Sequence, residues 1–385
     1  MGIALGSALV LGLVFLASVI SVEAGISVAV IEIVAGVVAG NYLGLHPAQW
    51  MDFLAGFGGI LLTFLAGAEV DPSLIRKNLK ASLLLGGFSF LAPYLATVAY
   101  CHLVIHWSWQ ASLVAGCALS TTSLAVVYAV LVETGLTSTS LGKLIMAATF
   151  VTDMGTALAL SLSFSSFSLR TLGFAASSAL IIVLAPKVLP PIFERYGKRV
   201  IEPEIKLLFL ILFTVMFLGE WGQSHAVLPV FVLGLCLARM FLRHKNLQVK
   251  LRTVAFAMIT PFFFIKGGMN VSLPTLAQSW RLFLVLLLLK TSAKFIGVWP
   301  FARRYMKGHA EYTTLLMSTG LTFGTISAYY GLKGGYIDAA QFTVLVSVVI
   351  ATAIIPTFIA QRWFSPVLPQ MARKEESMAR DEESQ

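Results

Sequence analysis

The sequence contains few charged residues and very few cysteines for its length. Charged side chains make up 12% of its 385 residues and hydrophobic ones 58%, whereas a soluble globular domain carries roughly 25% charged residues. The three cysteines, Cys101, Cys117 and Cys236, lie in apolar segments without the spacing of metal ligands. We therefore expect them to be small buried apolar residues in a polytopic membrane protein.

The excess of positive charge does not indicate nucleic-acid binding. The formal net charge is +9, but the lysines and arginines lie mostly in short clusters between apolar runs. The positive-inside rule produces this placement in membrane proteins. The N-terminal apolar run lacks a preceding basic region and fills a membrane span, so we interpret it as the first helix and not as a cleaved signal peptide.

Long apolar runs predict an all-α, multi-pass protein with about thirteen transmembrane helices, since about 17–25 residues cross a bilayer. Most basic residues fall on alternate loops, which predicts a cell (inner) membrane protein with its N-terminus outside and its C-terminus in the cytoplasm. Residues 1–362 form the predicted transmembrane domain, and residues 363–385 form a charged cytoplasmic tail. The predicted spans lie near residues 2–20, 25–44, 52–69, 82–104, 109–131, 141–164, 171–188, 205–220, 225–242, 253–272, 281–300, 311–331 and 340–361.

A weak internal repeat divides the chain into two halves. The stretch "TFLAGAEVDPSL" (63–74) resembles "FFIKGGMNVSLP" (263–274), with Gly67 aligned to Gly267. The charge pattern places these third and tenth spans in opposite orientations, which is typical of inverted-topology repeats. The polar segment 187–206 is a predicted linker between the halves.

Asp153 lies near the middle of the sixth span, and no other charged residue occurs between Lys143 and Arg170. A charge at this depth costs roughly 2.5–3.5 kcal/mol on insertion scales. Two interpretations remain open: a buried salt bridge with Lys294 of the eleventh span, or a carboxylate that exchanges a proton for a cation. Thr149, one turn before Asp153, shares its helix face and offers a hydroxyl oxygen, a hard ligand for an alkali cation.

Two spans have polar centres. The fifth contains "CALSTTSLAV" (117–126), and the twelfth contains "MSTGLTFGTIS" (317–327). Hydroxyl residues compete with helical hydrogen bonds and glycine weakens a helix. The stretches predict either two kinked helices or two broken helices that cross at the membrane midplane and form an ion site.

Among the other ionisable residues of the predicted spans, Glu32, Glu69, Lys266 and Lys290 merit attention. Glu69 is near a helix end, where it can reach the interface, and Glu32 lies among small residues, with a structural and a transport role both open. Lys290 receives no role from the sequence. Lys266, in "FFFIKGGMN", is an unusually deep cation.

The order and spacing of these motifs resemble the monovalent cation/proton antiporters of the Kef/Nap type, within the sodium/proton exchanger superfamily. The resemblance covers roughly residues 20–362. It is carried by five stretches taken together: "SVAVIEIVAGVVAGN" (27–41), "FGGILLTFLAGAEVD" (57–71), "STTSLAVV" (120–127), "TFVTDMGTALAL" (149–160) and "KTSAKFIG" (290–297).

The resemblance implies an elevator-like transporter. Its mobile core would contain helices of about 82–164 and 281–361, its dimerisation domain helices of about 2–69 and 205–272, and a linker helix about 171–188 would join them. By position, Asp153 matches the essential ion- and proton-binding aspartate, Thr122 and Ser123 match the polar crossing, Thr149 matches a hydroxyl ligand, and Lys294 matches the basic residue of the eleventh span.

The sequence departs from the family pattern at the residue before Asp153. Electrogenic members carry Asp-Asp and the familiar electroneutral branch carries Asn-Asp, whereas this chain has Thr152-Asp153. The twelfth span has "GLTFGT" where relatives carry a charged stretch. These differences bear on stoichiometry and ion choice. The site then holds one carboxylate, and Thr152 is expected to orient it through its hydroxyl.

The sequence therefore predicts a homodimeric antiporter that exchanges Na⁺ or K⁺ for H⁺ at Asp153, without a chemical reaction or cofactor. A Kef-like potassium efflux protein is a rival, although such proteins usually carry nucleotide-binding domains that this sequence lacks. A sodium-coupled organic-anion symporter is another, and Lys266 is the only sign of an anion contact. An intramembrane hydrolase is excluded because no Ser/His pairing or HExxH motif occurs.

Overall fold

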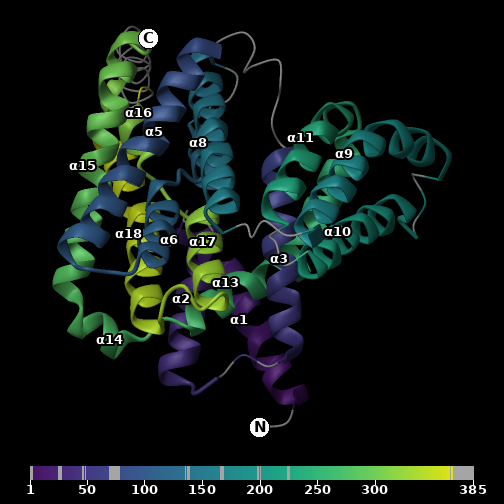
Figure 1. Cartoon of the computed structure of the whole chain (residues 1–385), viewed down its shortest axis with the longest axis horizontal. Helices are drawn as coiled ribbons and strands as arrows, with labels where there is room; N and C mark the ends of the chain where they lie inside the picture. Colours follow the sequence, from purple (N-terminus) through teal and green to yellow (C-terminus); the bar gives the residue numbers. More distant parts are fainter. Residues whose placement is uncertain are drawn as a thin grey trace, which may run out of the picture.

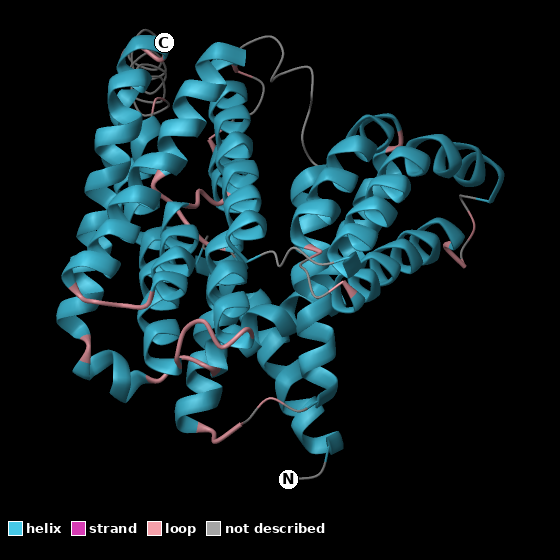
Figure 2. Cartoon of the chain, in the orientation of Figure 1, coloured by secondary structure: helices cyan, strands magenta, loops and turns pink. Residues whose placement is uncertain are grey.

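The computed structural model consists of helices and loops over the residues that it describes, as Figure 2 shows. It describes residues 3–24, 28–45, 47, 49–68, 79–134, 136, 139–164, 169–196, 199, 201–222, 226–364 and 366. Glu69 and nearly all of the predicted tail 363–385 lie outside these residues. The all-α fold class is confirmed for the described chain.

Every predicted span overlaps a helix or a pair of consecutive helices. Eight helices of the described chain are long and apolar enough to cross a membrane, and the total of thirteen crossings stays a prediction. The helices up to α9 are α1 (Ile3–Ala24), α2 (Val28–Tyr42), α3 (Gln49–Ala68), α5 (Leu79–Ala99) with the π-helical turn η1 (Tyr100–Val104), α6 (Trp109–Ser120), α7 (Leu124–Glu133), α8 (Ser140–Phe164) and α9 (Leu169–Tyr196).

The remaining helices run from α10 to α18. They are α10 (Pro203–Trp221), α11 (Val227–Arg243), α12 (Lys245–Val254) with the π-helical turn η2 (Ala255–Ile259), α13 (Thr260–Met269), α14 (Leu273–Gln278), α15 (Trp280–Tyr305), α16 (Ala310–Met317), α17 (Thr322–Lys333) and α18 (Ala339–Trp363).

Helix α9 is longer than the sequence indicates, because its last ten residues were predicted to begin the linker 187–206. It continues through three prolines, at positions 186, 190 and 191. Leu189 and Phe193 are buried in one apolar cluster with residues of α10 and α11. Burial of these side chains stabilises a helix that proline would otherwise end, as neighbouring helices do in membranes.

The helices form two groups. The crossing group contains α5–α8 and α15–α18, and the flanking group contains α1–α3 and α9–α13. In Figure 1, α3, α9, α10 and α11 of the flanking group stand beside the crossing group, and α1, α2 and α13 lie below it. The ranges predicted as core helices lie in the crossing group, and those predicted as dimerisation helices lie in the flanking group. Helix α9, predicted as a linker helix, packs against α10 and α11. The mechanical roles of the groups stay predictions.

Glycines bring pairs of helices in the flanking group into backbone contact. A Cβ atom on Gly67 of α3 would meet the carbonyl oxygen of Phe231 on α11, and one on Gly36 of α2 would meet the carbonyl oxygen of Ile265 on α13. The third span (α3) thus packs on the ninth (α11), and the second span (α2) packs on the tenth (α13). In an inverted repeat the second and third spans of one half correspond to the ninth and tenth of the other, so the two contacts are equivalent. The corresponding tight contact on α13 is made by Gly268, one residue after the Gly267 that aligns with Gly67 in the sequence.

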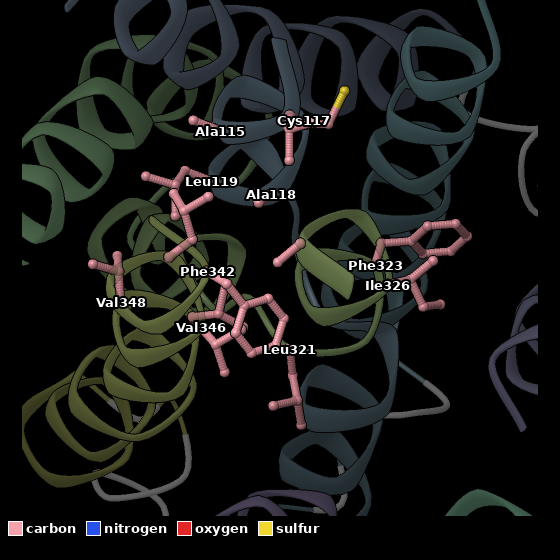
Figure 3. Packing of buried hydrophobic residues seen from close by; sticks show 14 of the residues in the cluster. Ala115, Cys117, Ala118, Leu119, Leu321, Phe323, Ile326, Phe342, Val346 and Val348 are labelled. Atoms are coloured by element: carbon pink, nitrogen blue, oxygen red, sulfur yellow. The ribbon is translucent and has the colours of Figure 1, made fainter. Parts of the chain in front are cut away.

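The largest apolar cluster spans both groups, from α6, α17 and α18 of the crossing group to α2, α3, α11 and α13 of the flanking group. The labelled side chains of Figure 3 come from α6, from α18 and from Leu321 and the start of α17; Phe323 and Ile326 point to the side of α17 that faces away from α18. Cys101 and Cys117 are buried there as predicted, but Cys236 is exposed. The prediction for Cys236 is wrong because it lies two residues after Gly234, whose face packs on α3, and so points to the opposite side of α11.

Candidate ion site at the crossing of two interrupted helices

Both polar stretches singled out in the sequence interrupt their helices. Residues 121–123 separate α6 from α7, and residues 318–321 separate α16 from α17. The two breaks contact each other: the backbone N–H of Ser123 donates to the carbonyl oxygen of Thr319 at 3.1 Å, and the hydroxyl of Thr122 donates to the carbonyl oxygen of Met317 at 2.8 Å. The broken-helix prediction is confirmed.

Hydroxyl side chains satisfy the backbone groups that each break releases. Thr121 has an extended backbone and its hydroxyl donates to the carbonyl oxygen of Ala118 at 3.2 Å. Ser123 accepts from the N–H of Val126 at 3.4 Å and so caps the start of α7. These two hydrogen bonds pair one carbonyl and one N–H of the backbone at the first break, which favours the departure from the helix there.

Asp153 lies in the middle of α8 and is only 2% exposed. Its Oδ1 atom has no hydrogen-bond partner in the described part of the protein, and neither has Oγ1 of Thr149. These residues are one turn apart on one face of the helix. Two buried oxygens with free lone pairs are thus presented together, and burial without partners is costly unless a proton or a cation binds them.

Thr152 occupies the place before Asp153 but has a different function in the packing. Its hydroxyl lies 3.2 Å from the carbonyl oxygen of Gly86 on α5 and 3.1 Å from that of Ala148, and donates to them. A Cβ atom on Gly86 would meet the same Ala148 carbonyl, so the two helices are in backbone contact here. Thr152 fastens α8 to α5 and thereby fixes the position of Asp153.

Lys294 of α15 is fully buried and bound by hydroxyl groups. Its Nζ donates to Oγ of Ser89 on α5 at 2.8 Å and to Oγ1 of Thr122 at 2.9 Å. No ion pair within 4.0 Å joins Lys294 to Asp153 among the described residues. The salt bridge considered from the sequence is therefore not formed.

Sequence reasoning did not assign Ser89, Lys290 or Thr352 to this region. Lys290 is also fully buried, and its Nζ donates to Oγ1 of Thr352 on α18 at 2.9 Å. Its spacing of four residues from Lys294 was a usable sign that both lysines face the crossing. Ser89 carries no such signal, because a serine in an apolar helix is common.

Lys266 of α13 is the one buried lysine among the described residues of the flanking group. Its Nζ lies 2.5 Å from Oδ1 of Asp52 and donates to the hydroxyl of Tyr329 on α17 at 2.6 Å. The lysine on α13 thus connects α3 with a helix of the crossing group. Glu32 of α2 is 2% exposed and lies beside the tight glycine contact with α13.

A cavity of about 500 Å³ lies between the two groups. Its wall is formed mainly by α3, α10 and α17, and it is largely apolar. Tyr329, Glu220 and Lys333 supply polar atoms. None of the residues predicted to form the ion site lines this cavity, so the site and the cavity are separate features.

Comparison with known proteins agrees with this geometry. The family model described as "Sodium/hydrogen exchanger, transmembrane" matches residues 6–365. The chain is 26% identical to "Probable Na(+)/H(+) antiporter 3" of Methanocaldococcus jannaschii, covering 86% of this chain and 89% of the relative. It is 25% identical to "Na(+)/H(+)-K(+) antiporter GerN" of Bacillus cereus, covering 88% and 90%.

The fold is also found among solved structures. The sodium proton antiporter MjNhaP1 from Methanocaldococcus jannaschii superposes with a TM-score of 0.68 at 16% identity, covering 93% of this chain and 97% of that one. Fold, family match and sequence relatives confirm the resemblance at the level of the family. The chain belongs to the transmembrane sodium/hydrogen exchanger family.

Proposed function

We propose that the protein exchanges a monovalent cation, Na⁺ or K⁺, for a proton at a single carboxylate, Asp153. The observation that carries this proposal is the pair of unpartnered buried oxygens, Oδ1 of Asp153 and Oγ1 of Thr149. A proton or a cation on Asp153 neutralises the buried carboxylate, and one site cannot hold both. Competition for one carboxylate couples the two fluxes.

The surroundings of Asp153 favour an alkali cation over a transition metal. Hydroxyl and carboxylate oxygens are hard ligands, and no group of three histidine, cysteine or acidic side chains suited to a metal occurs in the described chain. Relatives named as Na⁺/H⁺ antiporters support sodium, and the name of the Bacillus cereus relative includes potassium.

The two helix groups supply the parts of an alternating-access mechanism. The crossing group holds Asp153 and both helix breaks, and the flanking group has close backbone contacts that suit a fixed frame. The elevator-like proposal is that the crossing group moves past the flanking group in a homodimer of the inner membrane. The cavity between the groups gives this movement room on one side.

The structure weakens the main argument for a symporter, which is the presence of Lys266. An organic anion needs a fixed cationic contact, and Lys266 was the candidate. Its ammonium already contacts the carboxylate of Asp52 and the hydroxyl of Tyr329. A charge that is compensated in this way attracts an anion weakly.

The test is transport by the purified protein in proteoliposomes that contain a pH-sensitive dye. Addition of Na⁺, Li⁺ and K⁺ in separate titrations is expected to release protons with at least one cation, with an apparent KM that rises as the proton concentration rises. Uptake of a labelled organic anion in the same vesicles tests the alternative. Cation-independent dye signals, or sodium-driven anion uptake, would overturn the proposal.

A further inference from the structure

The two repeats can be aligned through their helix lengths. Asp153 is the fourteenth of the 25 residues of α8, and Thr352 is the fourteenth of the 25 residues of α18. Ser89 is the eleventh residue of the 26-residue helical stretch that begins at Leu79, and Lys290 is the eleventh of the 26 residues of α15. These helices occupy corresponding places in the two halves, so Thr352 corresponds to Asp153 and Lys290 to Ser89.

The side chains at the corresponding places also contact corresponding partners. Oγ of Ser89 lies 3.4 Å from Oγ1 of Thr122 in the first helix break. Lys290 reaches the second break, where a Cβ atom on Gly320 would meet its Nζ. In each half, a polar residue therefore contacts the interrupted helix of the same half: Ser89 of α5 contacts the first break, and Lys290 of α15 lies at the second.

The amino group of Lys290 binds one hydroxyl oxygen and lies beside the second helix break. Oγ1 of Thr352 accepts its hydrogen bond at 2.9 Å, and Oγ1 of Thr121 lies 2.9 Å from the Cβ position of Gly320 beside it. Helix α16 ends at Met317, and the carbonyl end of a helix carries partial negative charge. A side chain at Gly320 would displace the amine from this position.

We propose that the second repeat contains a counterpart of the Asp153 site in which the ammonium of Lys290 takes the place of the ion. The ammonium of Lys290 is a cation that is covalently attached to the protein, and Thr352 occupies the position that the carboxylate of Asp153 has in the first repeat. The subsite accepts a small free cation once the side chain of Lys290 is shortened. The proposal uses the Asp153 site of the proposed function as its reference, but the subsite itself contains no atom of Asp153.

The test is cation binding by Lys290→Ala, in a background of Asp153→Asn so that the first site cannot respond. The shortened side chain leaves room for methylammonium, which has the same heavy atoms as the Cε and Nζ end of a lysine side chain. Thermal unfolding of the detergent-purified protein is expected to shift to higher temperature with methylammonium and to saturate, because a ligand that binds only the folded state stabilises it. Lys290→Met, which fills the space without a charge, is the matched control and is expected not to respond.

Saturable stabilisation of Lys290→Ala that disappears when Thr352→Val is added supports the subsite. Equal shifts in the Ala and Met variants, or none in either, overturn it. Because Asp153 is absent throughout, a failure here is distinct from a failure of the proposed antiport.

A second measurement applies if Lys290→Ala does not fold. Lys290→Met alone, with Asp153 intact, is expected to lower the apparent KM for the transported cation about threefold or more at a similar maximal rate. The reason is that Lys290 and Lys294 lie one turn apart on the same face of α15, so removal of one amine changes the electrostatics around the site. An unchanged KM would mean that Lys290 is a neutral packing residue and would overturn the proposal.

Discussion

Gly67 and Asp153 lie in two groups of helices whose interiors are built differently. Around Gly67 the backbones of α3 and α11 touch, and a Cβ atom there would meet a carbonyl oxygen of the neighbouring helix. Around Asp153 the backbones of α5 and α8 also touch, at Gly86. Side-chain hydroxyls add hydrogen bonds between helices there, and Oδ1 of Asp153 and Oγ1 of Thr149 remain without partners. The contact at Gly67 is complete without a ligand, whereas the buried carboxylate of Asp153 is satisfied only when a proton or a cation binds it.

The difference suggests how one chain can combine a frame with a moving, ion-binding part. Close glycine contacts between membrane helices leave little room for rearrangement. Hydroxyl groups at helix breaks can exchange partners at small cost, because each hydroxyl both donates and accepts. The following experiments change one interior at a time.

The largest effect is expected for Asp153→Asn. Asparagine keeps the size of the side chain but cannot take up a proton or neutralise a cation, so exchange in proteoliposomes should fall to the level of protein-free vesicles. Size-exclusion chromatography should still show a folded, homogeneous protein, since Asp153 makes no ion pair with Lys294. Substantial remaining exchange would remove Asp153 from the mechanism, and loss of folding would assign it a structural role.

In the flanking group, Gly67→Val should damage stability more than transport chemistry. The added side chain would collide with the carbonyl oxygen of Phe231, and overpacking of this kind costs about 1–3 kcal/mol or more. Thermal unfolding in detergent measures the loss. Gly56→Ala on the same helix is the control, because nothing lies within 4 Å of its Cβ position; equal losses in both variants would contradict the close contact.

Thr149→Val and Thr122→Val should separate an ion contact from a scaffold contact. Removal of the free hydroxyl of Thr149 should raise the apparent KM for the cation about three- to tenfold, the range of one hydrogen-bond-sized contact, with little change in maximal rate. Thr122 bonds Lys294 and Met317, so its loss should lower the maximal rate and the stability as well. Identical changes of KM and maximal rate in the two variants would contradict this distinction between the unpartnered hydroxyl of Thr149 and the hydrogen-bonded hydroxyl of Thr122.

The smallest effect is expected from membrane voltage. With Thr152 before Asp153, the site has one carboxylate and is neutral with either one Na⁺ or one H⁺ bound, so exchange should be electroneutral. The rate under a potential imposed with K⁺ and valinomycin should equal the rate without it. A voltage dependence that is lost in Lys294→Gln would instead show that Lys294 carries a second proton through the cycle.

The sequence predicted the features that depend on local chemistry. The stretch from Ser120 to Ser123 predicted a helix break because hydroxyl residues compete with the helical backbone, and the structure has that break. Asp153 was a candidate because an isolated carboxylate in an apolar helix is costly. Its assignment as the ion site stays a prediction.

The features that the sequence did not reveal depend on contacts between distant segments. Lys294 meets Ser89, 205 residues away, through the packing of α15 on α5, and no local pattern marks that serine. Helix α9 passes three prolines because its apolar residues pack against α10 and α11. Local rules identify the residues that disturb a helix, but tertiary packing decides what those residues contact.

The contact between the two helix breaks has a consequence for how the protein is made. Thr122 and the Met317 carbonyl that it bonds are separated by 195 residues, so the ribosome completes the first interrupted helix long before its partner exists. In lipid, unpaired backbone groups cost several kcal/mol each. We therefore expect residues 121–123 to enter the membrane as part of a continuous helix and to break only when α16 and α17 arrive, which makes the ion site one of the last parts of the molecule to form during biosynthesis.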